Sequence, residues 1–120
     1  MNTSKVKILR IFISSTDKLK HKALYEVIVF AARRYKMAGA TVLKGIMGYG
    51  ATSTIFSIKF WEVMEKVPLV VEIVDEPEKI DLFFQKISPY LEKIKNGCIV
   101  TSFTADMVFF KPGKNKKTRQ

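Results

Sequence analysis

The sequence predicts an α+β fold in which two helices cover one face of a four-stranded antiparallel or mixed sheet. Two β-branched, apolar segments, 6–14 and 69–74, each lead into an amphipathic helical pattern and then into a further strand candidate. The apolar pattern of the first helix recurs 56 residues later. At 120 residues with 48% hydrophobic side chains, the chain is long enough for one domain with its own core. This order of elements is that of the ferredoxin-like βαββαβ sandwich.

The first half of the chain supplies a strand, a helix and a second strand. Residues 6–14 (VKILRIFIS) are apolar enough for a buried strand. The helix that follows carries one apolar face, made of Leu24, Val27, Ile28, Ala31, Tyr35 and Ala38. Gly39 is expected to end this helix, and 40–47 (ATVLKGIM) is the second strand candidate. The segment 55–64 stays open between a hairpin partner of that strand and, over 60–65, one helical turn.

From Pro68 the scheme repeats. The strand LVVEIV at 69–74 precedes a helix start at Asp75, which offers a capping oxygen, with Pro77 in the first turn. The apolar face of this helix is Ile80, Phe83, Phe84, Ile87, Leu91 and Ile94. Pro89 lies within the pattern and predicts a kink.

The last elements follow a short stop. Asn96-Gly97 ends the second helix, and CIVTSF at 98–103 is the fourth strand. Residues 105–110 extend that strand or form a separate edge strand. Together, residues 1–110 are expected to form a single domain.

Alternation along the two central strands predicts a sheet that is apolar on both faces. The face under the helices carries Leu9, Ile11, Ile13, Leu69, Val71 and Ile73. The opposite face carries Ile8, Arg10, Phe12, Val70, Glu72 and Val74. Because an open sheet normally presents polar residues to water, this second face predicts an interface with another copy of the chain. Arg10 and Glu72 would pair inside it; a surface ion pair on an ordinary face is the alternative.

The net charge of +10 is unevenly distributed. Residues 1–60 hold eleven Lys or Arg against two acids, whereas 61–110 hold five against nine. The tail 111–120 adds five cations without a bulky apolar side chain, so we expect it to be mobile. With one cysteine, no apolar run long enough for a membrane span and no secretory signal pattern, the expected location is the cytoplasm.

Several segments carry a specific resemblance. LRIFIS at 9–14, HKALYEVIVFAAR at 21–33, AGATVLKGIMGYGATS at 38–53 and PLVVEIVDEPEKI at 68–80 resemble a prokaryotic PII-like family long labelled only as uncharacterised. The likeness covers roughly residues 6–104. It implies a PII-like trimer of ferredoxin-like subunits whose sheets face the three-fold axis. It also implies a signalling protein that binds adenine nucleotides (ATP, ADP or AMP) between subunits and acts on a partner protein through the loop after the second strand.

The resemblance places the ligand at the base of that loop. The residues implied are Lys44, Gly45, Gly48, Tyr49, Gly50, Thr52, Ser53 and Lys95. Glycines let backbone N–H groups approach a phosphate; without the resemblance, a hairpin that needs positive φ explains them as well. PII proteins hold phosphate with an Asp-Gly-Lys run before the last strand, whereas this chain has Lys95-Asn96-Gly97-Cys98 there. Lys95, or the tail from Lys111, is the expected substitute.

Two other classes of function compete with this one. An enzyme needs a nucleophile with a base, or paired carboxylates; the lone His21 is expected on the surface and Cys98 in the core, so no catalytic residue and no metal site are predicted. A site shared between subunits stays open. An RNA-binding module of the same strand order would need aromatic residues on the first and third strands, where only Phe12 is available. RNA could still meet the basic tail nonspecifically.

Overall fold

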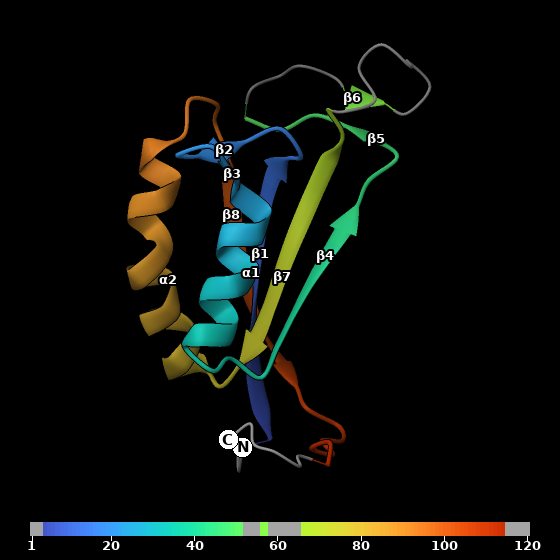
Figure 1. The fold of residues 1–120 in the computed structure, drawn as a ribbon. Coiled ribbons are helices and arrows are strands. Elements are labelled where there is room, and N and C mark those ends of the chain that lie inside the picture. Colours follow the sequence, from blue (N-terminus) through green and yellow to red (C-terminus); the bar gives the residue numbers. More distant parts are fainter. Residues whose placement is uncertain (1–3, 52–55, 58–65, 115–120) are drawn as a thin grey trace.

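The computed structural model describes residues 4–51, 56–57 and 66–114. Its centre is a four-stranded sheet in the order β4-β7-β1-β8, formed by Gly39–Lys44, Pro68–Asp75, Lys5–Ser14 and Ile99–Asp106. All three pairings are antiparallel. The first and third predicted strands therefore lie side by side at the centre, as predicted, with the other two at the edges (Figure 1).

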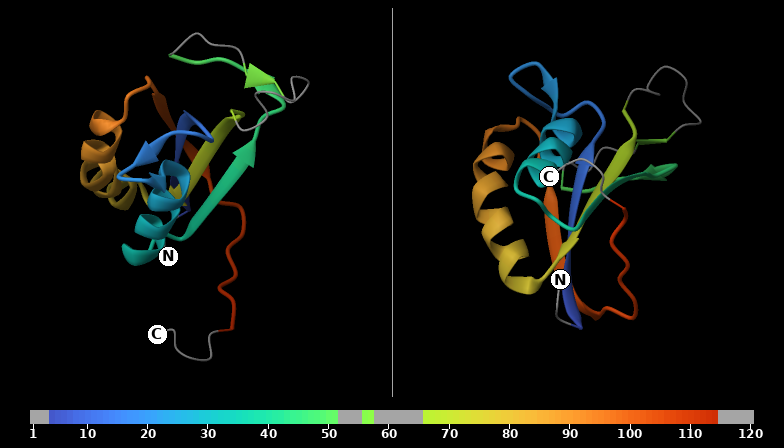
Figure 2. Two further views of the ribbon diagram at one scale, coloured as in Figure 1. Left: turned by 45° about the horizontal axis from the view of Figure 1, so that its top comes forward. Right: turned by 60° about the horizontal axis from the view of Figure 1, so that its bottom comes forward.

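Helices α1 (Leu24–Arg34) and α2 (Pro77–Lys93) cover one face of the sheet and leave the other face open (Figures 1 and 2). The ferredoxin-like α+β fold is thus confirmed. In the part of the chain that the structure describes, neither helix is long and apolar enough to cross a membrane.

The core lies between the helices and the covered face of the sheet. All six residues predicted for that face are buried: Leu9, Ile11, Ile13, Leu69, Val71 and Ile73. They pack against Leu24, Ile28 and Ala31 of α1 and Ile80, Phe83 and Ile87 of α2. Each fully buried aliphatic or aromatic side chain contributes about 1.5–3 kcal/mol of transfer free energy, so this layer carries most of the driving force for folding.

The first helix ends earlier than the sequence predicts. It stops at Arg34, with Tyr35 as the C-cap residue, and Lys36 takes the left-handed conformation (φ 62°) that was expected of Gly39. Gly39 instead begins β4, and Ala38 is exposed outside the helix, so both predictions were wrong. The backbone N–H groups of Tyr35 and Met37 bond back to the helix, which completes the cap before the glycine is reached.

The second helix begins one residue later than predicted. Its N-cap is Glu76, with Pro77 in the first turn, and no side chain caps it. Asp75 ends β7 and is buried; one carboxylate oxygen accepts the N–H of Glu76 and the other accepts the N–H of Ala38. The predicted capping oxygen therefore ties the end of β7 to the turn before β4. The helix runs through Pro89 to Lys93, and the kink stays a prediction.

The segment after α1 divides into two short strands rather than one. β4 ends at Lys44, and β5 (Met47–Gly48) pairs antiparallel with β6 (Phe56–Ser57). The hairpin alternative for 55–64 therefore holds at 56–57, while the helical alternative lies outside the described residues. β8 extends to Asp106, and residues 107–110 form no strand.

A small hairpin lies between β1 and α1. β2 (Lys18–Leu19) pairs with β3 (Lys22–Ala23) across a two-residue turn. Lys20 and His21 in that turn both have positive φ, 50° and 74°, the combination typical of a type I′ turn. Neither residue is glycine or asparagine, so the turn has no strong signature in the sequence.

Candidate functional site

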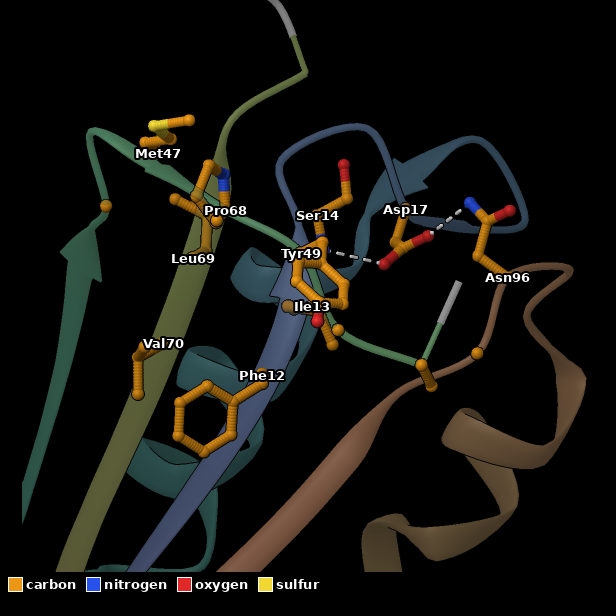
Figure 3. Close-up of a pocket in the computed structure, with 15 residues that line it drawn as sticks. Phe12, Ile13, Ser14, Asp17, Met47, Tyr49, Pro68, Leu69, Val70 and Asn96 are labelled. Atoms are coloured by element: carbon orange, nitrogen blue, oxygen red, sulfur yellow. Dashed lines mark hydrogen bonds between the residues drawn. The ribbon is translucent and has the colours of Figure 1, made fainter. Parts of the chain in front are cut away.

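A pocket of about 290 Å³ lies at the end of the sheet where β1 finishes and β7 begins (Figure 3). We call it the loop pocket. Its lining comes from the ends of these two strands, the loop after β4 and the loop before β8. The lining residues are Phe12, Ile13, Ser14, Asp17, Gly45, Met47, Gly48, Tyr49, Gly50, Ala51, Pro68, Leu69, Val70, Asn96 and Gly97.

One wall of the loop pocket is apolar. Phe12 and Val70 project from neighbouring strands on the open face of the sheet, and Pro68 lies above them (Figure 3). Tyr49 is 68% exposed and lies at the mouth, where it offers an aromatic ring and a phenol. A flat, largely apolar ring system is the chemistry that such a wall accepts.

The other end of the loop pocket is organised by Asp17, which the sequence analysis did not single out. Its side chain is 3% exposed and accepts two hydrogen bonds: the N–H of Ser14 at 2.9 Å and the side-chain amide of Asn96 at 2.9 Å (Figure 3). Its backbone carbonyl accepts the N–H of Leu24, the first residue of α1. Asp17 therefore joins the loop after β1, the start of α1 and the loop before β8. An aspartate that follows a turn offers no local signal for such a role.

The loops close around the pocket at one tight contact. A Cβ atom on Gly97 would lie 2.8 Å from the Cβ of Ala51, which is closer than side chains pack. Gly45 is restricted too, since a Cβ there would lie 3.0 Å from Pro68. Gly48 and Gly50 have room for one. Among the described residues no glycine has positive φ, so a hairpin that needs such glycines does not explain the run.

The predicted ligand residues divide into three groups. Gly45, Gly48, Tyr49 and Gly50 line the loop pocket. Lys44 and Lys95 are exposed outside its lining. Thr52 and Ser53 lie outside the described residues. The lining therefore contains one buried carboxylate, that of Asp17, and no lysine or arginine from the described chain.

The predicted interface residues lie together on the open face of the sheet. Arg10 and Glu72 are cross-strand partners, and the Arg10 Nε donates to the Glu72 Oε2 at 2.7 Å. The guanidinium also lies 5.0 Å from the ring centroid of Phe103, on β8. Apolar side chains surround the pair, including Phe12, Ile99 and Phe103, which are each 37–44% exposed. Whether a second copy covers this face stays a prediction.

The two candidate reactive side chains lie elsewhere. His21 is exposed in the β2–β3 turn. Cys98 is half-buried just before β8, and burial raises the pKa of its thiol, with smaller contributions from the negative charges of Asp17 and Glu92. Within the described residues, no group of three His, Cys, Asp or Glu side chains is placed to hold a metal ion.

Comparison with known proteins agrees with the fold. Residues 6–107 match the DUF190 family, described as "Uncharacterized ACR". A UPF0166 protein of Aquifex aeolicus is 34% identical over 109 residues, 91% of this chain and 99% of the relative. A UPF0166 protein of Methanocaldococcus jannaschii is 32% identical over 96 residues, 80% and 85% of the two chains.

Two solved structures show the same fold at low sequence identity. The nitrogen regulatory PII-like protein CPII of Thiomonas intermedia K12, bound to ADP, AMP and bicarbonate, superposes with a TM-score of 0.59 at 15% identity, covering 85% of this chain and 89% of CPII. A candidate PII-like signaling protein of Thermus thermophilus gives a TM-score of 0.58 at 16% identity and covers 88% and 94%. The fold of this chain is therefore PII-like.

Proposed function

The chain belongs to the DUF190 family, and on this premise we propose that it is a PII-like regulatory protein rather than an enzyme. A small anionic ligand, most simply an adenine nucleotide, binds the loop pocket. The loop after β4 then changes and acts on a partner protein. CPII, whose fold this chain shares, was solved with ADP and AMP bound.

The observation that carries the proposal is the composition of the loop pocket. Its apolar wall suits a purine, and its glycine-bearing rim, from Gly45 to Gly50, gives backbone N–H groups access to the ligand. The rim belongs to the loop that leaves β4. A ligand at this place therefore touches the segment that has to move if the loop is to signal.

The phosphates of a nucleotide have to be held outside the lining. No cation of the described chain lines the pocket, and Asp17 adds a negative charge at its inner end. We propose that the base occupies the pocket and that the phosphates extend toward Lys44 or Lys95. The tail from Lys111 leaves β8 beside Lys5, at the opposite end of β1 from the pocket, so within one subunit it is not the substitute that the sequence suggested. A neighbouring subunit brings further cations of the same kind.

Assembly is the second part of the proposal. The open face of the sheet carries exposed aromatic and aliphatic residues around Arg10 and Glu72, and covering it with copies of the same chain removes them from water. We propose a homotrimer in which these sheets face each other. Residues 1–110 then act as one domain, with 111–120 as its basic tail.

Native mass spectrometry with added ATP, ADP and AMP tests both parts. We expect a trimer that takes up to three nucleotides. In Gly50→Val, whose added side chain has room to enter the pocket, nucleotide uptake should fall at least tenfold while the mass of the assembly is unchanged. Gly113→Val is the matched control, because nothing lies within 4 Å of a Cβ placed on Gly113, and it should bind as the wild type does.

Each outcome has a defined meaning. A trimer that binds none of the three nucleotides would contradict the proposal of an adenine nucleotide ligand but support the proposed assembly. A monomer would contradict the interface. Equal nucleotide affinity in Gly50→Val and the wild type would show that the site is not the loop pocket.

A further inference from the structure

The outer surface of the two helices carries cations and exposed apolar side chains at the end remote from the loop pocket. Phe30, Arg33 and Arg34 lie on one stripe of α1, and Lys79, Leu82 and Lys86 on one stripe of α2, by their three- and four-residue spacings. Phe30 is 58% and Leu82 56% exposed. With Lys36, we call these residues the basic helix patch.

Tyr35 joins the two stripes. Its ring contacts that of Phe83 edge-on at 6.4 Å. The guanidinium of Arg34 lies 5.3 Å from the centroid of Tyr35, and the ammonium of Lys86, from the other helix, lies 5.0 Å from it. Two like charges, one from each helix, thus lie near one ring, whose electron-rich face attracts both.

These cations have no acidic partner within the described chain. The ion pairs among the described residues join Lys5 to Asp106, Lys7 to Asp81 and Arg10 to Glu72, and none of them includes a cation of the patch. The carboxylate of Asp75 is buried and bonded to backbone N–H groups. The acids at this end of α2 are Glu76, Glu78 and Asp81, of which Asp81 pairs with Lys7, against five exposed cations. The patch therefore keeps a net positive charge that an external anion can neutralise.

We propose that the basic helix patch docks the protein on an anionic lipid surface. The patch residues line neither the loop pocket nor the pocket between β1, β8 and α2, and the outer side of two packed helices suits a flat occupant better than an inserted peptide. Phe30 and Leu82 supply apolar side chains for the interface beside cations that meet lipid phosphates, as on membrane-surface helices. This inference goes beyond the proposed function and does not depend on the loop pocket.

Vesicle co-sedimentation tests it. The probe is vesicles of phosphatidylcholine with about 30% phosphatidylserine, at low salt, against vesicles of phosphatidylcholine alone. Because one cation near an anionic membrane contributes about 1 kcal/mol, Arg33→Gln/Arg34→Gln should lower the apparent partition coefficient about 30-fold. Lys116→Gln/Lys117→Gln is the matched control, with the same loss of charge in the tail, and should lower it less than threefold. Phe30→Ser should also weaken binding without a change in charge.

Lys86→Gln provides a second variant if the double arginine variant loses thermal stability; it should lower partition about fivefold. The proposal is wrong if the wild type does not sediment with the anionic vesicles, or binds both vesicles equally. It is also wrong if the tail variant loses as much binding as the helix variant. Tighter binding to soluble polyglutamate or to an RNA oligonucleotide than to the vesicles would assign the patch to an acidic macromolecule instead.

Discussion

The ion pair between Arg10 and Glu72 gives the sharpest test of assembly. The two residues are cross-strand partners on the central strands β1 and β7, joined at 2.7 Å. In the single chain their side chains are 42% and 28% exposed. Phe103 lies 5.0 Å from the guanidinium. What covers the pair therefore decides what it contributes to stability.

The loss of stability on removing the ion pair should differ between a sheet face exposed to water and one covered by a second copy. On a water-exposed face, the ion pair contributes about 0–1 kcal/mol and the contact with Phe103 about 0.5–1 kcal/mol. If a second copy of the chain covers the pair, removal of one partner leaves a buried, unpaired charge and lowers the free energy of unfolding by about 3–5 kcal/mol. We expect the larger figure for Arg10→Ala and for Glu72→Ala. The double variant should be destabilised by clearly less than the sum of the two, because it leaves neither charge alone.

The assay combines urea unfolding with the mass of the assembly. Unfolding is followed at two protein concentrations about tenfold apart, since the stability of an assembly depends on concentration. Native mass spectrometry reports whether Arg10→Ala still forms a trimer; we expect mostly monomer. Asp106→Asn is the control: this carboxylate also pairs with a cation across strands, that of Lys5, but its side chain is 76% exposed at the end of β8, so neither mass nor stability should change measurably.

One result would refute the reasoning. If Arg10→Ala lowered the free energy of unfolding by no more than about 1 kcal/mol and left the mass unchanged, the pair would be an ordinary surface ion pair. The open face of the sheet would then not be the interface, even if the protein were a trimer.

Four further predictions concern the loops and turns. Asp17→Asn removes a negative charge that raises the pKa of Cys98, so the thiol should be alkylated faster by iodoacetamide at mildly alkaline pH, measured by mass spectrometry; an unchanged rate would contradict the assignment. The pKa of Cys98 is raised in the folded state, so the folded protein holds the thiol proton more tightly than the unfolded chain does. The stability that Cys98 contributes should therefore be lost as pH rises through the alkaline range. The difference in urea midpoint between the wild type and Cys98→Ser should shrink over that range. Gly97→Val should separate the two loops, lowering both the melting temperature and nucleotide uptake, because even its Cβ would meet Ala51 at 2.8 Å. Asp75→Ala leaves two backbone N–H groups without their acceptor and should lower the free energy of unfolding by about 1–3 kcal/mol in urea titration; no change would mean that water replaces the carboxylate.

The sheet and its helices could be predicted because their signals are local and periodic. Alternation along the two central strands correctly assigned six side chains to the buried face under the helices: Leu9, Ile11, Ile13, Leu69, Val71 and Ile73. It also put Arg10 and Glu72 on the open face of neighbouring strands, and the antiparallel register of the structure brings them opposite each other. The boundary errors arose where hydrogen bonds outweighed residue preference. Lys36 took the left-handed position because the cap was already complete, and the two bonds of Asp75 kept it in β7.

The loop pocket could be predicted only in part. Its glycine rim follows a strand in the sequence and carries the family resemblance, so four of its residues were found. Asp17 and Asn96 are 79 positions apart and come together only when the fold is complete. Gly97 is required by a neighbour, Ala51, rather than by its own φ, and a single sequence carries no signal for that. Lys44 and Lys95 were predicted as ligand residues because they lie near the motif in the sequence. Closeness in the sequence does not fix the direction of a side chain, and neither lysine lines the pocket.

The proposed ligand site and the proposed interface share residues, so nucleotide binding and assembly should be coupled. Phe12 and Val70 line the loop pocket and also belong to the open face of the sheet that the proposed trimer buries. A ligand bound against these side chains would change the open face that a second copy contacts. A second copy on that face would in turn change the apolar wall that the ligand contacts. By linkage, a nucleotide that binds the trimer more tightly than the monomer must favour the trimer by the same factor. Dilution should then release nucleotide and subunits together, and Arg10→Ala, which does not line the pocket, should weaken nucleotide binding through assembly alone.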